Sequence, residues 1–345
     1  MNSSDFYYPK KQKKCFFRFC KIVSSASYVP KQIVTNEEII TKYQLPFKNN
    51  IILKTIGVEK RHLAEDSQDD SDLLYESARQ CIENHQLKPE KLTRIIVNKY
   101  MGDNLLPMTA SRLQSKLGST VANHVFDLDG GASSFLFSMD LAARYIATGD
   151  EYVLIASGGI HNRLISKTDP RVAFLFGDAS SSLLFGPADE PHILASYFFS
   201  NHQFYRLATA KGMEFIKKVP WDDANSIFFD TYAMDNWKIA EDFYRNATRE
   251  IYQNLLKESG LSFENIDLVL ATENNAQIKT IILEALGVDE TKSISLLKDY
   301  GNTMSAMLPL LLDFGLKNGK IQPDMNIMLI SFGEGISGGG MIYKV

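Results

Sequence analysis

Short apolar runs alternate with longer amphipathic stretches along most of the chain. Residues 94–97 and 151–157 are almost entirely apolar, which is typical of strands buried on both faces. Apolar residues instead recur at helical spacing in 71–85 and 241–260. This alternation predicts an α/β layered fold. The remaining elements predicted by pattern are a strand over 16–24, a short helix capped around Asn36, and a helix over 109–117.

One stretch predicts a sharp turn from a strand into a helix. The apolar pair Val125-Phe126 leads into Gly130 and Gly131, and a helical pattern then runs through Ile146. Small residues at such a turn deliver one side chain and several free backbone N–H groups to a single point, as in a nucleophile elbow. The residue at the apex is Ala132, whose methyl group can do no chemistry. The architecture of a catalytic site is therefore predicted without its reactive atom.

The two ends of the chain repeat the same order of elements. Residues 130–185 contain a glycine-rich helix start, a strand ending in Ser157, and a Phe-Gly-Asp sequence before a further strand. Residues 300–343 repeat this order, with Phe332-Gly333 before the last strand. The sequence therefore predicts two similar halves, 1–187 and 188–345.

An aromatic-rich segment at about 200–240 interrupts the second half. It includes Phe204, Phe215, Trp221 and Trp237. Two interpretations are equally favoured: an inserted cap over a pocket, or ordinary core aromatics.

Composition excludes several classes of function. The chain has 345 residues, 45% of them hydrophobic, and a net charge of −4, which is typical of a globular protein with neither a nucleic-acid partner nor an anionic membrane surface. No apolar run is long enough to cross a bilayer, and Arg18 and Lys21 interrupt a segment that otherwise resembles a signal peptide. The cysteines Cys15, Cys20 and Cys81 show no metal-ligand spacing. We expect a cytoplasmic protein with no cofactor and no metal.

Besides the elbow, several motifs lie along the whole length of the chain: Tyr28-Val29-Pro30, Gly57-Val58-x-x-Arg61-His62, Phe176-Gly177-Asp178, Tyr300-Gly301-Asn302-Thr303 and Phe332-Gly333-x-Gly335. In this order they resemble β-ketoacyl synthase III, the FabH-like branch of the thiolase superfamily. The resemblance implies a thiolase fold, in which two similar halves form a five-layered αβαβα arrangement with internal helices that start at Ala132 and Thr303. It also implies a dimer joined along an edge strand.

The family's chemistry, as the resemblance implies it, is a Claisen-type condensation. A cysteine at the elbow takes an acyl group as a thioester, while a histidine and an asparagine assist decarboxylation of a malonyl thioester. Carried over by position, the cysteine is replaced by Ala132 and the histidine by Thr272, while the asparagine is retained as Asn302. The family positions expected to line the substrate tunnel are Ser133, Phe135, Glu273, Asn275 and Gly335.

Two other interpretations concern these replacements. An engineered Cys-to-Ala change would explain Ala132 but not Thr272. Ser133 with Glu273 as its base could replace the lost pair, although Ser133 is better explained as a helix cap and Glu273 as a surface or hydrogen-bonded carboxylate. The positions at which the family grips coenzyme A fall near Ile51 and Thr55, which predicts a weakened grip.

Three functions stay open from the sequence. The favoured one is a catalytically silent subunit, in a homodimer or in a heterodimer with an active paralogue. The second is an acyltransferase or condensing enzyme that handles acyl thioesters without a covalent intermediate. The third is a protein that binds an acyl chain or an acyl carrier protein. Acyl-CoA and acyl carrier protein are the expected partners in all three.

Overall fold

The structure is a computed structural model, and it describes residues 18–104, 106–118, 122–163, 165–204, 208–210, 232–234, 237–333 and 337–345. In chain order the elements are β1 (Cys20–Tyr28), β2 (Gln32–Thr35), α1 (Asn36–Tyr43), α2 (Asn49–Thr55), β3 (Lys60–Leu63), α3 (Asp70–Asn84), β4 (Leu92–Asn98), α4 (Thr109–Leu117), β5 (His124–Leu128), α5 (Ser134–Ala147), β6 (Tyr152–Gly159), α6 (Pro170–Ala173), β7 (Ala179–Pro187), β8 (Ile193–Ser200), β9 (Ala208–Ala210), β10 (Tyr232–Met234), α8 (Trp237–Ser259), β11 (Leu268–Ala271), α9 (Ala276–Leu286), α10 (Leu297–Tyr300), α11 (Met307–Lys317), β12 (Asn326–Gly333) and β13 (Ser337–Lys344).

Two large sheets have the same topology. The first has the strand order β1-β7-β6-β4-β5, and the second has the order β8-β13-β12-β11. In the first sheet β1, β7 and β6 are antiparallel neighbours, and β6 is parallel to β4. In the second sheet β8, β13 and β12 are antiparallel neighbours, and β12 is parallel to β11. Each strand of the second sheet therefore has a counterpart in the first, and the predicted similarity of the halves is confirmed. The exact division between 187 and 188 stays a prediction.

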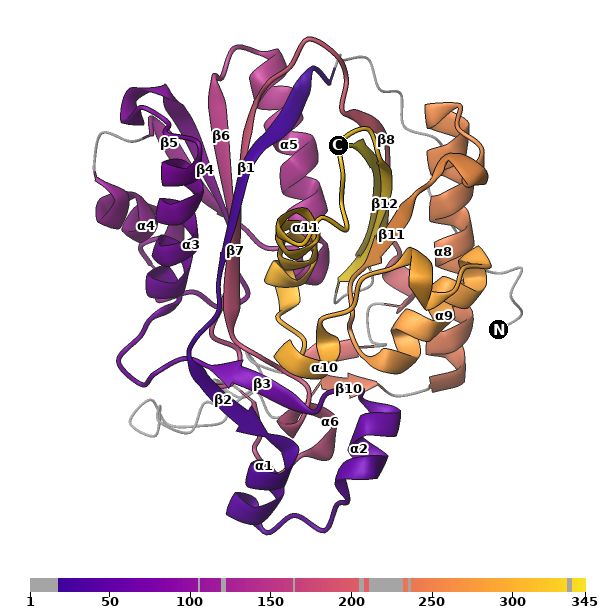
Figure 1. Cartoon of the computed structure of the whole chain (residues 1–345). Helices are drawn as coiled ribbons and strands as arrows, with labels where there is room; N and C mark the ends of the chain where they lie inside the picture. The colour runs from indigo at the N-terminus through magenta and orange to yellow at the C-terminus, as the bar shows by residue number, and fades with distance from the viewer. Residues whose placement is uncertain are drawn as a thin grey trace.

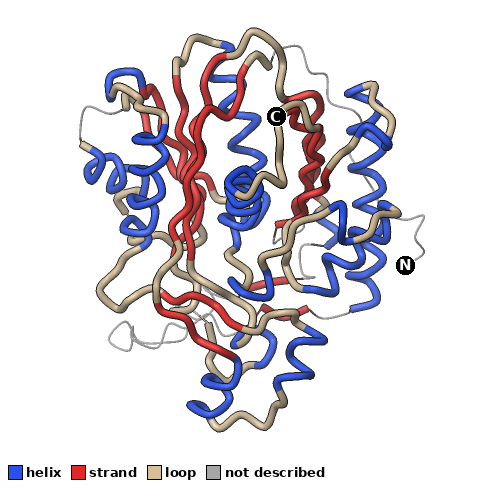
Figure 2. Tube along the Cα trace, in the orientation of Figure 1, coloured by secondary structure: helices blue, strands red, loops and turns tan. Residues whose placement is uncertain are grey.

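The sheets and helices form five layers (Figure 1). Helices α3 and α4 cover the outer face of the first sheet, and α8 and α9 cover the outer face of the second. Helices α5 and α11 lie between the sheets. Figure 2 shows the two groups of strands on either side of this central pair of helices. This is the predicted αβαβα arrangement. A smaller lobe, built from α1, α2, α6 and the β2–β3 pair, lies below the layers.

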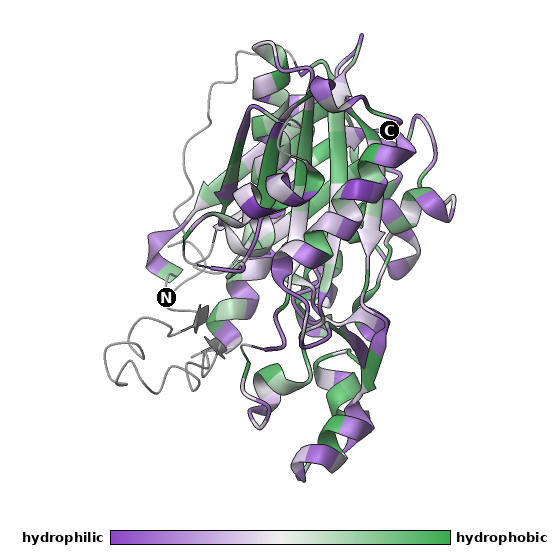
Figure 3. Ribbon diagram, turned by 90° about the vertical axis from the view of Figure 1, so that its left-hand side faces the viewer, coloured by the Kyte–Doolittle hydropathy of each residue, from purple (hydrophilic) through white to green (hydrophobic). Residues whose placement is uncertain are grey.

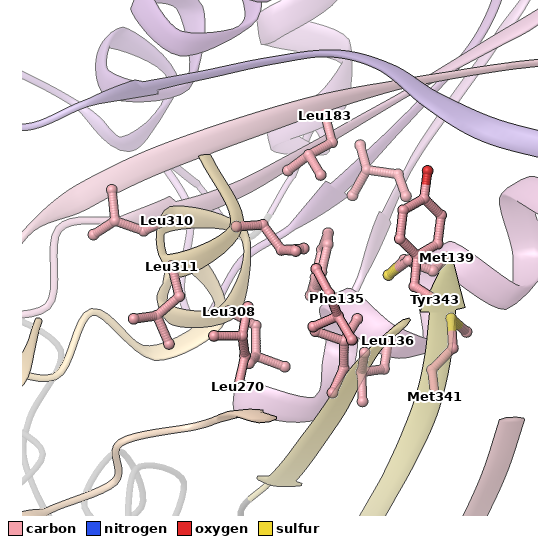
Figure 4. Close-up of a cluster of buried hydrophobic side chains, with 14 of the residues drawn as sticks. Phe135, Leu136, Met139, Leu183, Leu270, Leu308, Leu310, Leu311, Met341 and Tyr343 are labelled. Atoms are coloured by element: carbon pink, nitrogen blue, oxygen red, sulfur yellow. The ribbon is translucent and has the colours of Figure 1, made fainter. Parts of the chain in front are cut away.

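The core lies between the sheets, and the central helices supply much of it. Figure 4 shows side chains from α5 and α11 packing with side chains from β7, β11 and β13. Hydrophobic residues also run along the strands themselves (Figure 3), as expected where both faces of a sheet are covered. The labelled members of this cluster are Phe135, Leu136, Met139, Leu183, Leu270, Leu308, Leu310, Leu311, Met341 and Tyr343.

The pattern-based elements are largely confirmed, with two corrections. The helix predicted over 109–117 has those bounds as α4. The first strand was predicted over 16–24, but β1 spans Cys20–Tyr28, because its pairing with β7 continues to Tyr28. The first helix is capped by Thr35, whose side chain accepts a hydrogen bond from the Glu38 N–H, and Asn36 is its first residue. Cys15 and most of the aromatic-rich segment lie outside the described residues.

The helices of the described residues include none that is both long and apolar enough to cross a membrane. The longest of them, α8, has 23 residues and carries charged side chains throughout its length.

Candidate functional site

The predicted elbow forms at the end of β5. The chain turns at Gly131, which has φ +56°, a conformation that favours glycine. Residues Gly131–Ser133 form a 3₁₀ turn, and α5 begins at Ser134 without a side-chain cap. Ala132 lies in this turn and is 4% exposed. The N–H groups of the first helical turn are thus presented at the residue that the sequence placed at the apex.

The end of β12 is held against the elbow. The Ser331 hydroxyl donates a hydrogen bond of 2.9 Å to the Ala132 carbonyl oxygen. A Cβ atom on Gly333 would lie 2.6 Å from the Gly130 carbonyl oxygen, so only glycine permits this approach. The elbow of the first half and the last strands of the second half are therefore in direct contact.

Thr272 lies on the loop after β11 and is bonded to the same strand end. Its N–H donates to the Ile330 carbonyl at 2.9 Å, and its hydroxyl oxygen accepts from the Phe332 N–H at 3.2 Å. With 1% exposure and its oxygen paired to backbone, Thr272 fixes the loop to β12.

Asn302 precedes the second central helix and joins the same group of loops. Its side-chain N–H donates to the Asn274 carbonyl at 3.2 Å, and its side-chain oxygen accepts from the Met304 N–H at 2.7 Å. Hydrogen bonds through Ser331, Phe332 and Asn274 thus link Ala132, Thr272 and Asn302 around the end of β12. The structure brings the three sequence-predicted positions together, while their catalytic roles stay predictions.

Glu273 lies on the same loop but belongs to a different network. It is fully buried, and its Oε2 accepts from the Leu296 and Leu297 N–H groups at 2.8 and 2.9 Å. Its Oε1 accepts from the Ser295 hydroxyl and lies 3.0 Å from Lys279 Nζ. Both oxygens are therefore occupied at the start of α10, and Glu273 is a buried, fully bonded carboxylate rather than a surface one.

The other predicted tunnel residues have varied surroundings. Asn275 caps α9, since its side-chain oxygen accepts from the Ile278 N–H at 2.8 Å. Phe135 is fully buried in the core between the sheets (Figure 4). Ser133 is fully buried and its hydroxyl has no hydrogen-bond partner, so it does not cap α5. Gly335 lies outside the described residues.

Unpartnered polar atoms gather around this site. Of eight such buried side-chain atoms in the described residues, four belong to residues next to the predicted positions. Ser133 directly follows Ala132 in the chain, and Thr303 directly follows Asn302. Asn274 is bonded to Asn302 through its backbone carbonyl oxygen, while its side-chain oxygen has no partner. The fourth is Nε2 of His161, whose imidazole interacts with the backbone of Thr303. Unpaired buried polar atoms cost about 1–3 kcal/mol each, so this set marks a place suited to a polar ligand.

His161 is the residue that sequence reasoning missed. It lies after β6. Strands β5 and β6 are both parallel to β4, so their carboxyl ends lie at the same edge of the sheet. Burial lowers the pKa of its imidazole, against the opposing effects of the Asp178 carboxylate and the Thr303 backbone. The ring is therefore neutral at pH 7. A histidine two residues after a strand that ends in Gly-Gly indicated only the edge of the sheet, because the ends of parallel strands converge, and its position beside Thr303 had no local signal.

Family comparisons agree with this architecture. Residues 126–202 match the model for 3-oxoacyl-[acyl-carrier-protein] synthase III, and residues 256–345 match the model for its C-terminal part. The β-ketoacyl-[acyl-carrier-protein] synthase III of Staphylococcus aureus is 29% identical over 319 residues, which cover 92% of this chain and 96% of the relative.

Solved structures show the same fold. The 3-oxoacyl-[acyl-carrier-protein] synthase III of Aquifex aeolicus has a TM-score of 0.84 at 21% identity, over 94% of this chain and 100% of that one. The priming β-ketosynthase of the R1128 polyketide pathway has a TM-score of 0.86 at 22% identity, over 98% of this chain and 99% of that one. The fold is thus the thiolase fold of condensing enzymes. Within that class, both halves of the chain are similar to β-ketoacyl synthase III.

The buried Glu273–Lys279 pair generates a stability prediction. We expect Glu273→Gln to lower the free energy of unfolding by about 3–5 kcal/mol, because Lys279 would keep a buried charge without its partner. Urea unfolding followed by circular dichroism measures the change. Glu83→Gln, which removes an exposed partner of Arg79, is the control, with an expected loss of at most about 1 kcal/mol. Adding Lys279→Met to Glu273→Gln should recover much of the loss, and a double variant no more stable than the single one would contradict this account.

Asp70 generates a prediction of pH dependence. Burial raises its pKa to about 6; the Ile160 N–H opposes the shift, and Asp103 and Asp178 add to it. A carboxyl whose pKa is raised by folding stabilises the fold below its unfolded pKa, and this stability is lost as pH rises through 6. The side-chain oxygen of Asn at position 70 can still accept from the Ile160 N–H. We therefore expect the free energy of unfolding of Asp70→Asn, relative to that of the natural chain, to increase by about 3 kcal/mol as the pH rises from 4 to 7. Unfolding curves at several pH values measure this change, and Asp66→Asn, at an exposed position, is the control. If the difference in free energy of unfolding between Asp70→Asn and the natural chain were the same at every pH, the prediction would be wrong.

Proposed function

We propose that this chain is a catalytically silent subunit that pairs with an active condensing enzyme of the same family and shapes the partner's acyl tunnel. The observation that carries the proposal is Ala132 at the tip of the elbow, where a helix N-terminus would stabilise an anion but the side chain is a methyl group. Acyl transfer through a covalent intermediate needs a nucleophile at that point.

The neighbouring residues do not supply the missing groups. The Ser133 hydroxyl has no partner, so no base is bonded to it. The Glu273 carboxylate is fully used by Ser295, Leu296, Leu297 and Lys279. A serine without an adjacent base is a poor nucleophile, and losing a nucleophile or base costs several orders of magnitude in rate.

The sheet supports a dimeric arrangement. Strand β5 is at the edge of the five-stranded sheet, and it leads directly into the elbow. An edge strand offers unpaired N–H and C=O groups to a second chain. Pairing there would place the partner next to Ala132, which suits a subunit that acts on its partner's site.

We further propose acyl-CoA or acyl carrier protein as the substrate carrier. We also propose the cytoplasm as the location, where the free thiols of Cys20 and Cys81 would stay reduced.

A second candidate function is acyl transfer without a covalent intermediate. The observation that favours it is the set of unpartnered atoms on Ser133, His161, Asn274 and Thr303. Direct attack of a bound nucleophile on an acyl thioester needs orientation and hydrogen-bond donors to the developing oxyanion, and a neutral histidine can accept a proton.

Labelling with a thioester separates a silent elbow from an active one. After incubation with acetyl-CoA or an acyl carrier protein that carries a short acyl chain, intact-mass spectrometry should find no covalent adduct on the natural chain. Ala132→Cys should gain one acyl group, because the helix N-terminus lowers the pKa of a thiol at that position. Ser133→Cys is the matched control one residue further, where full burial should keep the thiol unreactive. A stable adduct on the natural chain would overturn the proposal.

Co-expression tests the pairing. We expect tagged natural chain and a cysteine-containing member of the family from the same genome to elute together as a 1:1 dimer in size-exclusion chromatography. Condensing activity of the purified dimer should depend on the partner's cysteine and be unaffected by Ala132→Gly. The recovery of homodimers alone, at every ratio of expression, would count against a silent subunit; condensation by the homodimer would favour the second candidate.

A further inference from the structure

A pocket of about 250 Å³ lies in the small lobe, between α1, the β2–β3 pair and the segment that ends at Lys167. Neither Ala132 nor Asn302 lines it, so it is separate from the site at the elbow. Its walls combine a basic side with an apolar side. The apolar side includes Val34, Ile39 and Leu63.

The basic side holds three cationic side chains. Lys42 projects from α1 and Lys167 from the loop after β6, and no ion pair joins either of them to an acid in the described part of the chain. Lys167 donates one hydrogen bond to the Asn162 carbonyl, which leaves two N–H groups for another partner. Burial lowers the pKa of Lys167, and the positive charge of Lys42 repels that of Lys167 and so lowers this pKa further. An anion between the two amino groups would relieve this repulsion.

The third cation is the guanidinium of Arg61, at the base of the pocket. It is fully buried, and it donates to the Val34 and Phe174 carbonyls and to the Asn36 side chain. Its Nε–H has no partner. Its positive charge adds to that of the two lysines along the pocket wall.

Glu38 is the acid on the pocket wall, and its charge acts favourably on Arg61, while no ion pair joins it to Lys42 or Lys167 among the described residues. Its carboxylate accepts from both the N–H and the hydroxyl of Thr35, at 2.6 and 2.8 Å, as part of the cap of α1. These bonds to Thr35 lower the pKa of Glu38. The carboxylate is thus held at the exposed N-terminal end of the helix, while Lys42 lies in its last turn.

We propose that this pocket binds a small organic carboxylate, with its charged group between Lys42 and Lys167 and its hydrocarbon part against Val34, Ile39 and Leu63. The volume suits a ligand of about ten non-hydrogen atoms or fewer, below the usual size of drug-like sites. The apolar side disfavours inorganic phosphate, which would leave it without a contact. This site is independent of the proposed function, because none of its residues belongs to the elbow.

Titration calorimetry with benzoate and butyrate as probes tests the proposal. Both should bind, whereas benzamide, which has nearly the shape of benzoate without its charge, should bind at least tenfold more weakly, because a charge-assisted hydrogen bond contributes about 1.5–3 kcal/mol. Lys167→Met and Lys42→Met should each weaken benzoate binding about tenfold or more. Lys54→Met, which removes an exposed lysine of α2, is the control and should leave it unchanged. Melting curves without ligand check that each variant is folded.

The affinity should also fall with rising pH. Burial lowers the pKa of Lys167 to about 8, with Asp178 opposing the shift and Lys42 adding to it, while Arg61 and Glu38 face the same pocket. The charged form that binds a carboxylate is therefore lost above pH 8, and we expect benzoate binding to weaken several-fold between pH 7 and pH 9. The proposal would be overturned if neither benzoate nor butyrate bound at about 10 mM, or if benzamide bound as tightly as benzoate. It would also be overturned if inorganic phosphate bound more tightly than benzoate, or if Lys167→Met bound benzoate as tightly as the natural chain.

Discussion

The enclosure of two helices between two sheets is the constraint on which the rest of the structure depends. Helices α5 and α11 have sheets on both sides, so their side chains must be apolar nearly all the way round. Their charged residues are paired: Asp313 of α11 is bonded to Ser25 and Lys317, and Asp140 of α5 is bonded to Arg144. A helix enclosed in this way can expose only its ends. Both helices begin after a 3₁₀ turn, Gly131–Ser133 and Met304–Ala306, and these turns lie in contact with each other. The location of the site therefore follows from the packing of the core.

Convergence at the end of β12 gives the site its shape. The elbow and the loop after β11 are tied to one strand end by hydrogen bonds from Ser331, Phe332 and Thr272. The loop that carries Asn302 joins them through the Asn274 carbonyl oxygen. The bond to position 132 uses only the Ala132 carbonyl oxygen, so it does not depend on the side chain there, whereas position 272 is held partly by its own hydroxyl. The scaffold can consequently hold its geometry with an alanine at the elbow. The fold around the elbow therefore does not depend on which side chain stands at position 132.

Much of this could be predicted from the sequence, because the relevant signals are local. The glycines at the elbow, the alternation of apolar runs and the repeat of element order depend on near neighbours, and they predicted an α/β fold, two similar halves and a turn at Ala132. The five layers were implied by the family resemblance. Glu273 could not be placed in this way. Its burial depends on Lys279 and on the backbone of Leu296 and Leu297, and no local pattern reports such pairing. His161 was missed for the same reason, since only the folded chain places it beside Thr303.

The unpartnered polar atoms bear on how the site is used. A region whose only role was to complete the core would be more stable with apolar side chains, because each unpaired buried donor or acceptor carries a desolvation cost. Ser133, His161, Asn274 and Thr303 each carry such an unpartnered atom near the elbow. Such a cost is offset when a polar molecule occupies the site and supplies the missing hydrogen bonds. An elbow with a methyl group at its tip and unpartnered donors beside it is therefore consistent with binding a thioester carbonyl, which needs donors, whereas cleaving it through an acyl-enzyme needs a nucleophile as well.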